Sequence, residues 1–145
     1  MSLRDGTKKM SKSEESDYSR INLTDDADLI SKKIKKAKSD SEVIPDDLKL
    51  LEKKPEALNL ITIYSEISKN KKDNVINEMS GKDYSFLKKK LIDLIVNEIT
   101  PIGKEIKKLS QEKAHLKAIL KKGSQKATII AEENLKNIRE KVGLL

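Results

Sequence analysis

Residues 83–109 read DYSFLKKKLIDLIVNEITPIGKEIKKL, a long stretch in which apolar residues recur at helical spacing. From Ile95 to Leu109, isoleucine and leucine follow one another at steps of four, three, four and three residues. This spacing places the side chains along one face of an α-helix. Pro101 cannot donate a hydrogen bond to the carbonyl of Asn97, so we expect a kink there or a break into two helices.

Three more helices are predicted on the N-terminal side of this stretch. The first follows Thr24, a favoured N-cap residue, and runs to about Lys38. The second begins at Pro55, because proline suits the first turn of a helix, and its wide apolar arc predicts that it is the most buried helix. A short helix over residues 75–79 then precedes the long stretch.

The apolar pattern continues on the C-terminal side as far as Gly123, which we expect to end a helix. Ser124 can then cap a final helix. The residues predicted on the buried side of that helix are Ala127, Ile130, Ala131, Leu135, Ile138 and Val142.

The fold class follows from these helices, since no stretch shows the alternation typical of a strand. The sequence predicts a mainly α protein in which a helical bundle, residues 25–145, follows an irregular segment, residues 1–24. We expect the apolar face of residues 83–109 to lie in the core of that bundle rather than at a free dimer interface, because the other apolar helices need a surface to cover.

The composition limits the classes of function. Lys plus Arg number 31 against 24 Asp plus Glu, and a net charge of +7 favours anionic partners such as nucleic acid. A lysine-rich surface that serves solubility alone is the alternative. With one Phe, three Tyr and no Trp, base-stacking platforms are disfavoured. The chain has no Cys, and no apolar run approaches the roughly 18 residues of a membrane span, so we expect a cytoplasmic protein without membrane contact.

Few residues are suited to catalysis. His115 is the single histidine and has neither Cys nor a suitably spaced Glu beside it, so we expect no metal site and interpret it as a satisfied or exposed side chain. A serine nucleophile would need that same histidine as its base. No glycine-rich phosphate-binding motif occurs among the five glycines.

Residues 9–13, KMSKS, form the exception, in a segment without apolar periodicity that is typical of a mobile loop. Lysine ammonium groups neutralise a polyphosphate, and serine hydroxyls donate hydrogen bonds to it. Lys9 and Lys12 are three residues apart and can each reach an oxygen of a departing pyrophosphate, a reaction that depends on positioning and charge more than on acid–base chemistry. An isolated cluster of this kind would more often be a solvated loop.

KMSKS is, letter for letter, the signature of class I aminoacyl-tRNA synthetases. The likeness extends over essentially the whole chain, which resembles the C-terminal portion of a bacterial tryptophanyl-tRNA synthetase. The segments that carry it are SLRDGTK at 2–8, SRINLTDDAD at 19–28, KKIKKAK at 32–38, PEALNL at 55–60 and GSQKA at 123–127.

The resemblance implies an enzyme that uses ATP, with magnesium, to activate tryptophan as the adenylate and then transfers it to its tRNA. In such an enzyme the KMSKS loop closes on the ATP phosphates, the helical domain engages the anticodon region, and two subunits form a homodimer. Carried over here, the ATP-binding residues are Lys9, Met10, Ser11, Lys12 and Ser13. Lys9 and Lys12 are the catalytic candidates, and Lys12 is the leading one.

The lysines of the first predicted helix are weaker candidates, for tRNA binding. Lys32, Lys33, Lys35 and Lys36 crowd its C-terminal part. Contacts to an RNA backbone would explain them, but so would the favourable interaction of cations with a helix C-terminus.

The chain departs from the family in two ways. Glu14-Glu15 replaces the Asp that often follows the signature, and the second signature, H-x-G-H, needs two histidines where this chain has one. In the family, that element and the tryptophan pocket belong to an upstream Rossmann domain. We therefore expect a fragment that is inactive alone. Residues 1–3 resemble an internal segment of the family, and both a natural start and a truncation boundary stay open for Met1. The open alternatives are a non-catalytic RNA-binding module and a structural helical bundle with an accidental KMSKS.

Overall fold

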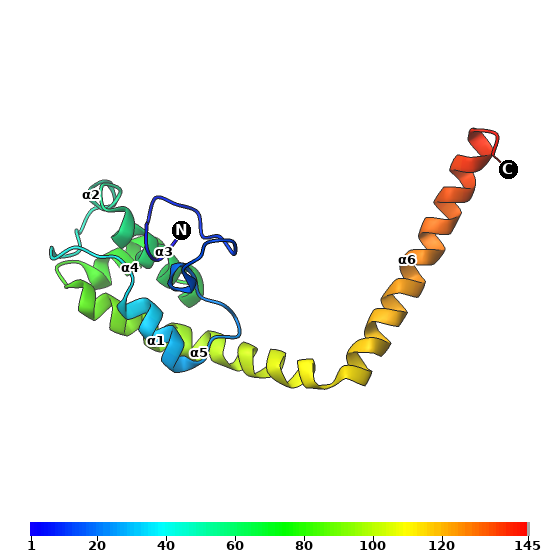
Figure 1. Ribbon diagram of the computed structural model, residues 1–145. Coiled ribbons are helices and arrows are strands. Elements are labelled where there is room, and N and C mark those ends of the chain that lie inside the picture. Colours follow the sequence, from blue (N-terminus) through cyan, green and yellow to red (C-terminus); the bar gives the residue numbers. More distant parts are fainter. Residues whose placement is uncertain (145) are drawn as a thin grey trace. The chain divides into compact units, whose positions relative to one another are not determined.

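The computed structural model describes residues 1–144 and is mainly α, with no strand in that part of the chain (Figure 1). A 3-10 turn, η1, spans Asp17–Ser19. The six helices are α1 (Ala27–Lys35), α2 (Leu48–Leu51), α3 (Pro55–Ser68), α4 (Lys72–Met79), α5 (Tyr84–Gln111) and α6 (Lys113–Lys141). The predicted fold class is confirmed. The chain separates into two compact units, Met1–Lys104 and Glu105–Leu145, and α5 runs from the first into the second.

The hydrophobic core of the first unit joins α1, α3, α4 and the first half of α5. Each of these helices contributes one apolar stripe. Fully buried aliphatic side chains of the longer helices, α3 and α5, belong to the same core cluster as those of the shorter helices, α1 and α4. Pro55 is the first residue of α3, as predicted. The most deeply buried core residues are Ile30, Ile34, Leu51, Ala57, Ile61, Met79, Leu87, Leu91 and Ile95.

Helix α1 begins later than its sequence predicts. Its N-cap is Asp26, whose side chain accepts a hydrogen bond from the Leu29 backbone at 2.8 Å, and Thr24 is not the cap. The reason is a turn just before the helix, in which the Asp25 backbone N–H donates to the Asn22 carbonyl at 3.1 Å. Thr24 is part of that turn, so its hydroxyl does not meet the first free amides of the helix.

The same helix also ends earlier than predicted, at Lys35 instead of about Lys38. The Lys38 backbone N–H donates to the carbonyl of Leu3 at 2.8 Å, which takes the chain out of the helix and into contact with the N-terminal segment. The Lys38 N–H therefore bonds to a residue far away in the sequence instead of to a carbonyl of its own helix. Helical periodicity cannot predict such a long-range hydrogen bond.

Residues 1–24 are irregular, yet they pack closely on the first unit. Leu3 is 2% exposed and is part of the core, and the Met1 ammonium group donates to Asn59 of α3 at 2.9 Å. A Cβ atom on Gly6 would lie 2.4 Å from the carbonyl oxygen of Pro55, so only glycine allows this approach of two backbones. Figure 1 shows the dark blue segment curling beside α3.

Pro101 does not break α5, which continues through it to Gln111. The ring is exposed and removes one hydrogen bond, while the bonds of the neighbouring turns persist. The prediction that the whole apolar face lies in the core was wrong beyond Ile99. Ile102 is 45% exposed and Leu109 is 36% exposed, because among the described residues the hydrophobic core extends along α5 only as far as Ile99.

The second unit differs most from the sequence-based prediction. Helix α6 runs without interruption through Gly123 and Ser124, so neither ends nor starts a helix. A glycine inside a helix costs only about 1 kcal/mol, which flanking helix-forming residues offset. The apolar side of α6 is not buried either: Ile130 is 64% and Ile138 55% exposed, because no other helix in the described part of this unit covers it.

No helix of residues 1–144 combines the length and apolar character needed to cross a lipid bilayer.

Candidate functional site

The KMSKS loop, residues 9–13, lies between two hydrogen-bonded segments of the first unit. On its N-terminal side, the Ser2 backbone N–H donates to the carbonyl of Lys8 at 2.8 Å. The carboxylate of Asp5 accepts from the Thr7 hydroxyl at 2.6 Å, and this hydrogen bond is the main reason that the pKa of Asp5 is lowered. On its C-terminal side, the chain re-enters the structure through η1, where the Leu3 N–H donates to Ser19 at 2.8 Å.

The side chains of the loop are presented to solvent. Lys9, Lys12 and Ser13 are exposed, Met10 and Ser11 are half-buried, and the hydroxyl oxygens of Ser11 and Ser13 lie 2.9 Å apart. Within the described part of the chain, neither Lys9 nor Lys12 has a carboxylate within ion-pair distance. Two uncompensated ammonium groups beside two hydroxyls can bind an anion such as a phosphate group.

The Lys33 side chain is not exposed on the surface of α1, as its interpretation as a tRNA-binding residue requires. Its ammonium group is fully buried, 2.6 Å from the carboxylate of Asp17 and 2.6 Å from that of Asp25. The hydrogen bond from Lys33, followed by one from Asn22, lowers the pKa of Asp17. A buried, doubly paired lysine cannot meet an RNA phosphate, so Lys33 leaves the group of tRNA-binding candidates.

The position of Lys33 in the sequence indicated its burial, but the lysines around it suggested an exposed basic face instead. Residue 33 is three positions after Ile30 and four before Ala37, on the same helix face as these two core residues. A lysine on an apolar stripe, with several aspartates just upstream, indicates a buried ion pair. Asp17 and Asp25 are the partners that the sequence alone did not assign.

The other lysines of α1 remain on the surface. Lys32, Lys35 and Lys36 are exposed, and the ammonium group of Lys36 lies 4.6 Å from the ring centre of Tyr18. All three belong to the last turn or the C-cap of α1, so the macrodipole accounts for part of their placement. As a group they form an exposed basic edge in the same unit as the KMSKS loop.

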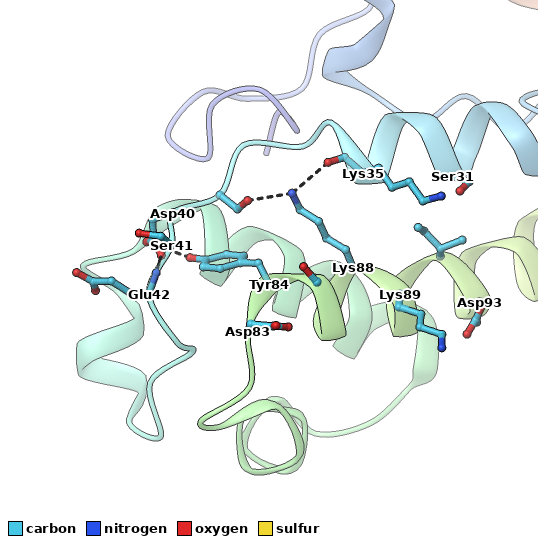
Figure 2. Close-up of a pocket in the computed structure, with 13 residues that line it drawn as sticks. Ser31, Lys35, Asp40, Ser41, Glu42, Asp83, Tyr84, Lys88, Lys89 and Asp93 are labelled. Carbon is cyan, nitrogen blue, oxygen red and sulfur yellow. Dashed lines mark hydrogen bonds between the residues drawn. The ribbon is translucent and has the colours of Figure 1, made fainter.

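An open cavity of about 750 Å³ lies between the end of α1, residues 39–42 and the start of α5 (Figure 2). Its lining is mixed in charge, with Lys35 and Lys89 opposed by carboxylates such as Asp93. Lys88 is committed to structure: its ammonium group donates to the carbonyl of Ala37 at 2.7 Å and to the hydroxyl of Ser39 at 2.9 Å. A third bond, to the carbonyl of Lys35 at 3.2 Å, satisfies the last residue of α1. Burial lowers the pKa of Lys88.

Tyr84 closes one side of the same cavity. Burial, followed by the charge of Asp40, raises the pKa of its hydroxyl, which donates to the Asp40 carboxylate at 3.3 Å. In residues 1–144, no three acidic or histidine side chains converge as metal ligands, and His115 is exposed on α6.

Comparison with known proteins agrees with the loop chemistry. Residues 1–100 match the family of tRNA synthetases class I (W and Y). The tryptophan–tRNA ligase of Mesorhizobium japonicum is 48% identical over 145 residues, which are 100% of this chain and 41% of that protein. That of Caulobacter vibrioides is 43% identical over 143 residues, covering 99% of this chain and 42% of that protein.

A solved structure supports the same relation. The crystal structure of tryptophanyl-tRNA synthetase from Mycoplasma pneumoniae superimposes with a TM-score of 0.58 and 29% identity, over 74% of this chain and 34% of that one. The chain spans about two fifths of the length of the curated relatives. Because residues 1–100 match the family model, the chain belongs to the class I tRNA synthetases of the tryptophan and tyrosine group.

Proposed function

We propose that this chain is part of a tryptophan–tRNA ligase and supplies two of its working parts. Residues 9–13 bind the phosphates of ATP, and the helices that follow bind tRNA. The observation that carries the proposal is the exposed KMSKS loop with two uncompensated lysines, in a chain matched along its whole length by proteins named tryptophan–tRNA ligases. Residues 1–24 form the connection to a catalytic domain, and residues 25–145 form the tRNA-binding part.

In the proposed mechanism the loop acts on the leaving group. When tryptophan attacks ATP, negative charge accumulates on the departing pyrophosphate, and the ammonium groups of Lys9 and Lys12 neutralise it. The Ser11 and Ser13 hydroxyls donate hydrogen bonds to the same oxygens, and the Met10 backbone shapes the turn. We propose no protein ligand for magnesium in this chain, because Mg²⁺ at such sites is usually held by the nucleotide phosphates.

The partners proposed for the whole enzyme are ATP, tryptophan and the matching tRNA. It would act in the cytoplasm as a homodimer. The remaining catalytic groups, including the H-x-G-H element of the family, would come from a domain that this sequence does not contain.

The test is amino-acid-dependent ATP–pyrophosphate exchange. We expect no exchange by the chain alone, and tryptophan-dependent exchange by a chimera that joins it to the part of the Mesorhizobium japonicum ligase that it does not match. Tyrosine should be inactive in the same assay. Exchange by the chain alone at the rate of a whole synthetase would contradict the fragment assignment. Tyrosine-dependent exchange, or a folded chimera without activity, would contradict the proposed function.

The tRNA contact is tested through its salt dependence. Replacing Lys35 and Lys36 by alanine should weaken tRNA binding and reduce the slope of log K against log salt by about 0.7–0.9 for each phosphate that is no longer neutralised. Filter binding between about 50 and 200 mM salt measures this slope. The matched control is Lys49→Ala with Lys53→Ala, which removes the same charge from exposed positions at and after α2. Equal effects of the two double variants would argue against a contact on α1.

A purely RNA-binding module is the alternative. It would bind tRNA with this salt dependence, while the chimera would show no exchange with either amino acid.

A further inference from the structure

A single arginine outside the KMSKS loop binds the backbone of the turn that carries Lys12. The Nη1 atom of Arg20 donates to the carbonyl oxygens of Ser11 at 3.3 Å and of Glu14 at 3.1 Å. These two carbonyls flank Lys12 and Ser13 on either side. In the described part of the chain, no other side chain from outside the segment is hydrogen-bonded to residues 9–14.

The guanidinium group of Arg20 is itself fixed by an ion pair with Asp17. Its Nη2 atom lies 3.1 Å from one carboxylate oxygen of Asp17, and its side chain is only 17% exposed. The other oxygen of Asp17 lies 2.6 Å from the buried ammonium group of Lys33. Lys33 also pairs with Asp25 at 2.6 Å, and its side chain is fully buried.

Asn22 completes a group of five side chains linked by ion pairs and hydrogen bonds. We call this group the charge network; its members are Arg20, Asp17, Lys33, Asp25 and Asn22. The amide of Asn22 donates to Asp17 at 3.0 Å and to Asp25 at 3.3 Å, and its backbone N–H donates to Asp25 at 2.9 Å. Each carboxylate therefore has at least two partners. A network this fully satisfied is rigid, because rotating any one member leaves a charged group without its partner.

The consequence is a continuous series of polar contacts from the buried face of α1 to the backbone around Lys12. A guanidinium group suits this position, since its planar N–H groups donate to two carbonyls and a carboxylate at the same time. An ammonium group on a flexible stem cannot hold all three in that geometry. Neither the KMSKS signature nor the charge pattern assigns any role to Arg20.

We propose that Arg20 is a positioning residue for the KMSKS loop. It orders the turn of residues 11–14 against the charge network, so that the Lys12 ammonium group is presented in a restricted direction before ATP arrives. Such ordering lowers the entropy lost when the loop engages the phosphates. This inference rests on the proposed function for its catalytic consequence, but the ordering of the loop does not depend on it.

The first arm of the test measures loop order in this chain without any substrate. In Arg20→Ala, the ¹⁵N order parameters of residues 11–14 should fall from rigid values near 0.85 to below about 0.6. Arg20→Lys should fall between the two. The control is Arg4→Ala, because Arg4 donates to the carbonyl of Lys36 at 3.2 Å and does not touch the loop. Unchanged order parameters in Arg20→Ala would overturn the inference.

The second arm measures exchange kinetics in the chimera. Arg20→Ala should lower kcat for tryptophan-dependent exchange and raise KM for ATP, each by about three- to tenfold, while KM for tryptophan is unchanged. Arg20→Lys should recover part of both losses, and Arg4→Ala should match the unsubstituted chimera. A loss of folded protein would lower kcat alone, with both KM values unchanged, and that result would overturn the positioning role.

The two arms separate the inference from the proposed function. If the loop loses order while the unsubstituted chimera shows no exchange, the proposed function fails and the role of Arg20 in ordering the loop stands. If the loop loses order and exchange by an active chimera is unaffected, the positioning role in the reaction is overturned.

Discussion

Replacing Asp25 by alanine is expected to lower the free energy of unfolding of this chain by about 3–5 kcal/mol, the range found when one member of a buried ion pair is removed. Asp25 and Lys33 are both almost fully buried, at 5% and 0% side-chain exposure, and 2.6 Å apart. Without Asp25, the buried ammonium group retains only Asp17, whose side chain is 46% exposed. Urea unfolding of the chain, followed by circular dichroism, measures the change.

Two variants show whether the loss of stability comes from the buried Lys33 charge that has lost a partner. Asp26→Ala removes the neighbouring carboxylate, an exposed N-cap, and should cost only about 1 kcal/mol. Asp25→Leu combined with Lys33→Met removes both charges and should be closer in stability to the unsubstituted chain than Asp25→Ala is. A cost for Asp25→Ala no larger than that for Asp26→Ala would show that the pair contributes little.

Lys12→Ala in the chimera is expected to slow tryptophan adenylate formation by more than tenfold, a loss of over about 1.4 kcal/mol of transition-state stabilisation. The Lys12 side chain is exposed and has no carboxylate partner in the described residues. In the proposed mechanism its charge is available to the departing pyrophosphate, where it stabilises the transition state most. Single-turnover formation of the adenylate measures the effect without contributions from product release.

The matched control is Lys8→Ala, which removes a lysine four residues away. Lys8 lies outside the signature, and its ammonium group is 3.7 Å from the carboxylate of Asp5. This variant should change the rate by less than about twofold, as expected of an exposed ion pair. An unchanged rate in Lys12→Ala would remove Lys12 from the mechanism, whereas equal losses in both variants would point to the overall positive charge of the loop.

Some local features of the fold were predictable. Proline has a fixed φ and no N–H, so Pro55 indicated the start of α3 from residue type alone. The apolar stripes of α1, α3 and α4 repeat at helical spacing, and the structure buries them together. KMSKS was recognisable because the whole signature lies within five consecutive residues.

Other features depended on residues distant in sequence or on the neighbouring helices that a segment meets. Helix α6 has an apolar pattern that predicts burial, yet it is exposed, because amphipathicity says which face could pack and not whether a partner is there. Gly123 is typical of a helix end, yet α6 continues through it at a cost of about 1 kcal/mol.

The sequence by itself determined the helical class, the start of α3 and the presence of the KMSKS signature, since each rests on residue types within a few positions of one another. Tertiary structure alone decided that Lys33 is buried between Asp17 and Asp25, and that Arg20 reaches the carbonyls beside Lys12. The physical reason is that the free energy of a charged side chain depends on its partners and on its exposure to water. Both are set when distant segments pack together.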